Sequence, residues 1–144
     1  MSVSQLSTFH VGQYAFGIEV EAVQEVIRYQ TMTRVPLAPP SVGGLINLRG
    51  QVITAIDLGH RLGLPPRAEG ELPMNVVVRT PDGAVSLLVD RIGEVVNARS
   101  EDFEAPPETM TGPGRELVTG AYKLDGSLLL ALDVPRVVDV LPAP

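Results

Sequence analysis

The sequence has no cysteine and few aromatic residues, and this excludes several classes of fold and site. Without cysteine there is no disulfide framework, no thiolate nucleophile and no zinc–thiolate centre. Aromatic residues make up only 4% of the chain, and tryptophan is absent. The core must therefore consist of valine, isoleucine and leucine, a composition that favours β-strands.

Positive charge and long apolar runs are also scarce. The formal net charge is −6, whereas nucleic-acid-binding proteins carry a basic stripe and anionic membrane surfaces attract basic proteins. No run approaches the roughly 18 apolar residues of a membrane-spanning helix, and residues 1–8 lack the pattern of a signal peptide. The chain of 144 residues has room for one compact unit or two very small ones. We expect a cytoplasmic protein.

Short strands alternate with turn signals along most of the sequence. The turns are expected at Gly12-Gln13, Arg49-Gly50, Pro81-Asp82-Gly83 and Asp125-Gly126. About nine short strands with little helix predict an all-β barrel or sandwich. We expect nine of them at Ser7–Val11, Tyr14–Val20, Leu45–Leu48, Val52–Ile56, Met74–Thr80, Ala84–Asp90, Arg91–Ala98, Leu117–Leu124 and Ser127–Leu132, and a further one within Glu21–Tyr29 after a helical turn.

Two segments share a plan of strand, turn, apolar strand, aspartate and short helix, which suggests a duplication. Asp57 and Asp133 precede the two short helices as expected N-caps. The strand Val52–Ile56 has apolar residues on both faces, which predicts that both faces are covered. The proline-rich Thr31–Pro40 is expected to be an extended connector. The polar loop Pro65–Pro73 is the expected boundary between the halves.

The sequence contains few residues suited to catalysis or ligand binding. His10 and His60 have no acidic neighbours at metal-ligand spacing and are expected to be structural. Thr111-Gly-Pro-Gly-Arg115 is a poor phosphate loop, because Pro113 removes a backbone donor and no helix follows. No serine lies in a nucleophile elbow. These features predict a binding module without enzymatic activity, metal or cofactor.

Arg49 is the unusual charged residue, because it closes the apolar strand Leu45–Leu48. A charge at the end of a buried strand needs a partner, and Glu25, between Val23 and Ile27, is the candidate. Two interpretations remain open: a fixed ion pair at the surface or core edge, or a pair that frames a docking groove.

Several segments, in this order along the chain, resemble the CheW family, the adaptors that couple chemoreceptors to the histidine kinase CheA. The resemblance covers Thr8 to about Val140 and predicts a single CheW-like domain over residues 8–141, with two sub-barrels that meet near residues 65–73. The segments that carry it are Tyr14-Ala-Phe-Gly-Ile, Val23-Gln-Glu-Val-Ile27, Thr33-Arg-Val-Pro36, Gly44-Leu-Ile-Asn-Leu-Arg-Gly-Gln-Val52, Ile56-Asp-Leu58, Leu88-Val-Asp90, Pro106-Pro107 and Thr119-Gly120.

The resemblance implies two intertwined five-stranded SH3-like β-barrels with short helices and no enzymatic activity. It implies two partners, the regulatory domain of a CheA-type kinase and the cytoplasmic helical-hairpin tip of a receptor, at membrane-associated receptor arrays. No nucleic acid, cofactor or membrane insertion is implied.

The resemblance also implies site residues. Val23, Glu25, Gly44, Arg49 and Val95 match positions tied to receptor coupling. A groove of Val, Ile and Leu would receive an amphipathic helix, which adds three apolar neighbours: Ile27, Ile46 and Leu48. The strand that meets the kinase corresponds to Val85, Ser86 and Leu87, of which one face must fill the core; family members can carry glycine in place of Ser86.

Two other functions remain open. The first is a CheW-like scaffold in a non-flagellar pathway that controls gliding, twitching or gene expression. The second is a small-ligand-binding barrel, which would need a polar pocket with convergent titratable groups.

Overall fold

The computed structural model describes residues 2–108 and 110–140, which form eleven β-strands with a few short helical turns. The predicted all-β class is confirmed. The strands are β1 Val3–Val11, β2 Tyr14–Glu19, β3 Val23–Ile27, β4 Val42–Leu48, β5 Gln51–Asp57, β6 Met74–Thr80, β7 Gly83–Val89, β8 Arg91–Arg99, β9 Phe103–Glu104, β10 Val118–Leu124 and β11 Ser127–Leu132. The α-helices are α1 Leu58–Arg61 and α2 Val134–Val137, and the 3-10 turns are η1 Val20–Ala22, η2 Ser100–Asp102 and η3 Pro113–Leu117.

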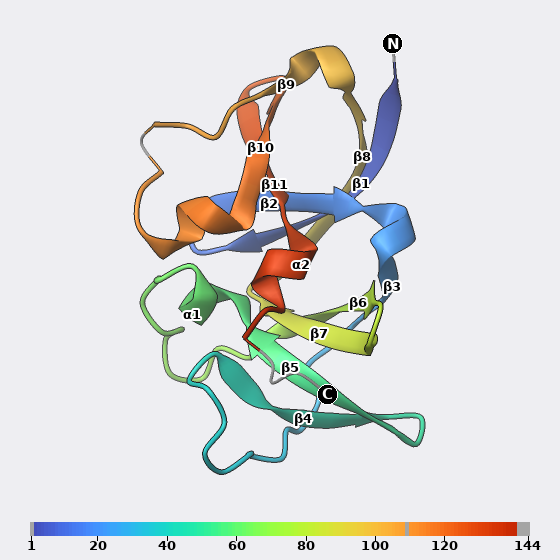
Figure 1. Ribbon diagram of the computed structural model, residues 1–144, viewed down its shortest axis with the longest axis vertical. Coiled ribbons are helices and arrows are strands. Elements are labelled where there is room, and N and C mark those ends of the chain that lie inside the picture. Colours follow the sequence, from blue (N-terminus) through green and yellow to red (C-terminus); the bar gives the residue numbers. More distant parts are fainter. Residues whose placement is uncertain (1, 109, 141–144) are drawn as a thin grey trace.

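The strands form two sheets that lie one above the other (Figure 1). The six-stranded sheet has the order β8-β1-β2-β11-β10-β9, and the five-stranded sheet has the order β3-β6-β7-β5-β4. The sixth strand, β9, is only two residues long. Each sheet contains one parallel pair, β2 with β11 and β5 with β7, and its other pairs are antiparallel.

The chain passes between the sheets twice, so the two units are intertwined. It leaves the six-stranded sheet after β2 through η1 and returns after β7 at Asp90. The loop of residues 65–73 joins α1 to β6, and the strands before and after it belong to the same sheet. The expected sub-barrel boundary near 65–73 is therefore corrected. Local loop composition indicates a connection, but it does not reveal which distant strands pair.

The core has three parts, because both sheets are covered on two faces. The largest cluster fills the space between the sheets and includes Phe9 and Phe16 from one sheet and Ile56 and Leu87 from the other. Smaller clusters cover the opposite faces, around Leu129 in the six-stranded sheet and around Ile46, Ile53 and Val77 in the five-stranded sheet.

Local signals in the sequence account for the ends of several elements. Asp57 and Asp133 cap α1 and α2, accepting hydrogen bonds from the backbone N–H of His60 and Arg136. A helical turn followed by a strand occurs within Glu21–Tyr29 as predicted. Neither helix is long and apolar enough to cross a membrane within the described ranges.

Candidate functional site

The five-stranded sheet is curled so that its two edge strands, β3 and β4, approach each other. Ile27 on β3 and Leu48 on β4 both pack against the buried cluster of Ile46, Ile53 and Val77. No ladder pairs β3 with β4 in the described part of the chain, since they lie at opposite ends of the strand order. We call this meeting of the two edges the seam.

An ion pair crosses the seam. The Arg49 guanidinium donates a hydrogen bond to the carboxylate of Glu25. Arg49 lies in the turn between β4 and β5, and Glu25 lies on β3. The structure thus brings together the two charged residues that the sequence pairs.

Arg49 also has an unusual backbone. Its φ is +52° and that of Gly50 is +85°, as in the tight two-residue turns that Asn-Gly and Gly-Gly favour. The Asn47 side chain supports the turn by accepting a hydrogen bond from Gly50 N at 3.0 Å. A non-glycine residue in the left-handed region is uncommon and raises the energy of the folded chain by on the order of 1 kcal/mol.

The pair is more open to water than a charge on a buried strand would be. The Arg49 side chain is 69% exposed and that of Glu25 is 20% exposed. Of the two locations that the sequence leaves open for a fixed pair, Arg49 is at the surface, because the turn carries its side chain beyond the sheet. An ion pair with one water-exposed partner contributes under about 1 kcal/mol to stability.

The other expected groove residues fall into three groups. Val23, Ile27 and Leu48 are half-buried, Ile27 and Leu48 beside the seam and Val23 against the cluster between the sheets, whereas Gly44 and Ile46 are buried and cannot touch a partner directly. Val95 is exposed but lies on β8, the edge strand of the other sheet.

Gly44 has a packing role. A Cβ there would lie 2.8 Å from the Thr33 carbonyl oxygen and 2.9 Å from Met32 Cβ. Its absence lets the connector after β3 cross close to β4, where Thr33 and Leu45 exchange two backbone hydrogen bonds of 2.8 Å. Gly44 thus shapes the seam by admitting the connector.

The strand predicted to dock on the kinase is buried on both faces. Val85, Ser86 and Leu87 are at most 6% exposed, because β7 lies between β6 and β5 inside the sheet and carries side chains into two core clusters. These residues cannot form a docking surface, and the assignment is corrected. The Ser86 hydroxyl donates to Asn75 Oδ1 at 2.7 Å, and Asn75 Nδ2 donates to the Arg28 carbonyl oxygen at 3.1 Å, so this buried polar pair is satisfied.

An exposed apolar groove lies instead on the outer face of β4 and β5. The groove has a volume of about 600 Å³. The proline-rich connector forms one wall, and Leu37 stands fully exposed at its rim with a φ of +64°. Val52, next to Thr54 on the same face of β5, is 63% exposed, so the expectation that this strand is covered on both faces is wrong at Val52. We call the groove on this outer face the connector groove. It is lined by Val35, Leu37, Val42, Leu45, Thr54 and Val140, with Pro36, Ala38 and Pro39.

The sequence contained a signal for this groove. The connector carries Val35 and Leu37 among its prolines, and a proline-rich segment cannot pair as a central strand. Apolar residues on such a segment either pack onto the fold or face a partner.

The described residues place no metal-binding cluster beside these surfaces. Among residues 2–108 and 110–140, no group of three or more His, Asp or Glu side chains is placed to hold a metal ion. His60 Nδ1 lies 3.0 Å from the Ser41 hydroxyl, and His10 lies on β1. The described surfaces are suited to binding.

Comparisons with known proteins agree with this geometry. A family model described as "CheW-like domain" matches residues 5–141. The chain is 32% identical to "Chemotaxis protein CheW" of Treponema pallidum (strain Nichols), over 92% of this chain and 80% of that protein. It is 29% identical to the protein of the same name in Bacillus subtilis (strain 168), over 94% and 86%. The crystal structure of the scaffolding protein TtCheW from Thermoanaerobacter tengcongensis superposes with a TM-score of 0.81 at 27% identity, covering 91% of this chain and 89% of that one.

Proposed function

The chain belongs to the family of CheW-like domains and has a chemotaxis adaptor role, and we propose that it bridges a chemoreceptor and a CheA-type histidine kinase without enzymatic activity of its own. It would work in the cytoplasm, at membrane-associated receptor arrays. The relatives named above are chemotaxis proteins, which favours this output over gliding, twitching or gene regulation.

The proposed receptor surface is the seam with its neighbours Ile27 and Leu48. The observation that carries this proposal is the backbone of Arg49. Arginine in the left-handed region is less favourable than asparagine or glycine in such a turn, and its exposed ion pair recovers little free energy. A strained residue that contributes little to stability indicates a functional role. The Arg49 guanidinium is placed to meet a polar group of the receptor tip.

The half-buried apolar residues beside the pair suit a helix. Ile27 on β3 and Leu48 on β4 lie beside the charged pair, whereas Val23 packs on the other face of β3 against the cluster between the sheets. An amphipathic helical hairpin would cover Ile27 and Leu48 with its apolar side chains and place polar ones near Arg49. Val95, on the other sheet, would extend the surface.

The proposed kinase surface is the connector groove together with Val52. Its lining contains no charged side chain, as is typical of the centre of a protein interface. We assign it to the CheW-like regulatory domain of the kinase, because apolar surface of this kind on a sheet fits another small β-domain. This assignment replaces the buried strand β7.

Two single substitutions test the proposal. Arg49→Asn should weaken binding of a receptor hairpin fragment by about tenfold and leave kinase binding unchanged, because only the seam loses a group. Val52→Asp should weaken binding of the kinase regulatory domain by a similar factor, because it places a charge at an apolar contact. Calorimetric titration with both partner fragments from the same organism measures the two affinities. Equal losses for both partners in either variant would contradict the division into two surfaces.

A further inference from the structure

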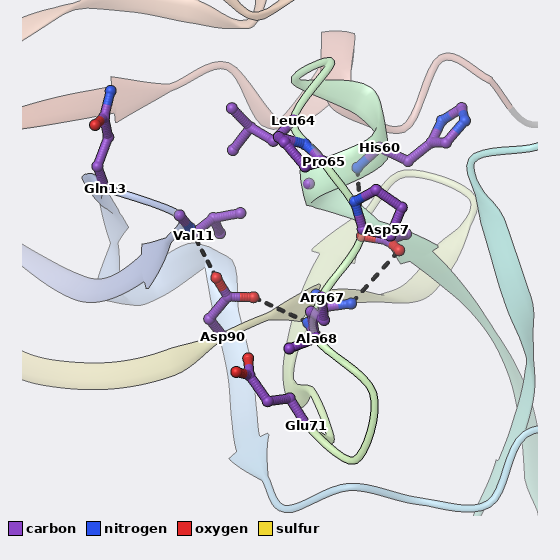
Figure 2. Close-up of a pocket in the computed structure, with 13 residues that line it drawn as sticks. Val11, Gln13, Asp57, His60, Leu64, Pro65, Arg67, Ala68, Glu71 and Asp90 are labelled. Atoms are coloured by element: carbon purple, nitrogen blue, oxygen red, sulfur yellow. Dashed lines mark hydrogen bonds and ion pairs between the residues drawn. The ribbon is translucent and has the colours of Figure 1, made fainter.

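A cleft of about 540 Å³ lies where the two sheets meet, and one arginine stands at its centre (Figure 2). One wall is the β1–β2 hairpin with Val11, Gly12 and Gln13, and the other is formed by α1 and the loop that follows it. Most of that loop is exposed, but the Arg67 side chain is only 16% exposed. Arg67 therefore points back into the protein from a surface loop.

The Arg67 guanidinium contacts three groups from separate parts of the fold. Its Nε lies 2.9 Å from Asp90 Oδ1. Its Nη1 lies 3.5 Å from Asp57 Oδ2, and its Nη2 donates to the Leu88 carbonyl oxygen at 3.3 Å. Asp57 ends β5 and Leu88 is the last residue but one of β7, both in the five-stranded sheet, while Asp90 is the residue at which the chain crosses to the other sheet.

Asp90 is fastened in turn to the six-stranded sheet. Its Oδ2 accepts a hydrogen bond from Gly12 N at 2.7 Å, and its own N–H donates to the His10 carbonyl oxygen at 2.9 Å. A continuous path of polar contacts thus runs from the β1–β2 hairpin through Asp90 and Arg67 to Asp57. The Gly12–Asp90 contact is a charge-assisted hydrogen bond, and the contacts of Arg67 with Asp90 and Asp57 are ion pairs of 2.9 and 3.5 Å.

Arginine is the side chain suited to this position. Its planar fork reaches two carboxylates and a carbonyl oxygen at once, which the single ammonium of lysine does not. Without it, Asp57 and Asp90 would remain in the same cleft as like charges with no cation between them.

We propose that Arg67 is a positioning residue that fixes the orientation of the two sheets, and so of the receptor surface that they share. This inference rests on the proposed function. The receptor surface combines the seam of the five-stranded sheet with Val95 on β8, which starts directly after Asp90. The residues of the connector groove lie on or beside β4 and β5, with the exception of Val140, and Val52 lies on β5. The kinase surface therefore depends little on the angle between the sheets.

This difference gives a test by binding. Arg67→Met should lower receptor affinity by roughly fivefold, a typical coupling between separate elements, and leave kinase affinity unchanged. Arg99→Met is the matched control, because Arg99 forms a local and exposed pair with Asp102 at 3.2 Å; it should change neither affinity. Equal receptor affinities in the two variants would overturn the inference. If the wild-type chain binds neither partner, the proposed function fails, and the measurement below still decides the role of Arg67.

The absence of cysteine permits a direct measurement of the sheet orientation. Ser127→Cys on the six-stranded sheet and Gln51→Cys on the five-stranded sheet provide exposed sites for two spin labels. Pulsed electron resonance should give a narrow distance distribution that broadens with Arg67→Met and not with Arg99→Met.

Amide exchange at Gly12 should accelerate on the order of tenfold in Arg67→Met, since its acceptor Asp90 is loosened. If Arg67→Met does not fold, Arg67→Lys should broaden the distribution to a smaller extent; unchanged distributions in the variant that folds would refute the positioning role.

Discussion

In both sheets, the strand that ends in a helix-capping aspartate lies between an antiparallel hairpin partner and a parallel neighbour. In the five-stranded sheet this is β5 between β4 and β7, and in the six-stranded sheet it is β11 between β10 and β2. Both hairpins contain a register shift that precedes a buried glycine, Gly44 in β4 and Gly120 in β10. The duplication suggested by the Asp57 and Asp133 segments therefore extends to whole strands.

The two sheets differ in how their edges are closed. In the six-stranded sheet a second connector, which joins β8 to β10, forms β9; this strand pairs with β10 at two positions, and the rings of Phe103 and Tyr122 lie 4.9 Å apart. In the five-stranded sheet the connector forms only the Thr33–Leu45 bridge, and the Glu25–Arg49 ion pair crosses the remaining seam. An edge that is closed by side chains, and not by backbone pairing, keeps charged side chains available for a partner. The receptor surface is therefore proposed at the seam.

The largest expected effect tests the burial of β7 against an exposed position in the other sheet. Leu87→Ala should lower the free energy of unfolding by about 2–5 kcal/mol, because Leu87 is fully buried between the sheets. Leu128→Ala on β11, where the side chain is exposed, should change it by less than about 1 kcal/mol. Urea denaturation measures both values. A small loss for Leu87→Ala would mean that β7 is accessible after all.

The next effect compares the two glycines that admit the connectors. A Cβ at Gly120 would lie 2.3 Å from Phe103 Cζ and 2.6 Å from the Glu104 carbonyl oxygen. Gly120→Ala should therefore cost about 1–3 kcal/mol by overpacking the β9–β10 contact, and Gly44→Ala at least as much, because its Cβ would meet the Thr33 backbone and its φ of +155° strains an alanine. Thr119→Ala, at the exposed neighbouring position, is the control for urea denaturation. Equal stability of the three variants would argue against tight crossing of both connectors.

The smallest effect on stability concerns the seam. Arg49→Asn should leave the free energy of unfolding unchanged or raise it by up to about 1 kcal/mol, because Asn-Gly suits the turn better than Arg-Gly.

A double-mutant cycle of Glu25→Gln and Arg49→Ala should give a coupling energy under about 1 kcal/mol. A coupling of 3 kcal/mol or more, as for a shielded pair, would make the pair a structural lock.

Short-range chemistry in the sequence predicted what depends on neighbours along the chain. The turns at Gly12-Gln13 and Asp125-Gly126 and the caps at Asp57 and Asp133 follow from residue types within a few positions. The all-β class follows from the number of such strands and turns.

The errors concern contacts between distant segments. The apolar run Val85–Val89 has no polar face, which indicates a strand covered on both sides, whereas the family resemblance implies a docking strand there; the burial of β7 agrees with the apolar pattern. The loop near residues 65–73 resembles a boundary, but the pairing of β5 with β7 across it depends on packing that composition does not encode. The Glu25–Arg49 contact could be predicted because each charge is unfavourable near a buried strand without a partner. The connector groove depends instead on how the chain folds back over β4 and β5.

We propose that one chain holds two different partners at once. Sedimentation velocity of the chain mixed with the kinase regulatory domain and a receptor hairpin fragment, each above its Kd, measures this binding. A species with the mass of a 1:1:1 complex should form, and Val52→Asp and Arg49→Asn should each reduce it to a different binary complex. Mutually exclusive binding, with either partner displacing the other from the wild-type chain, would rule out simultaneous binding.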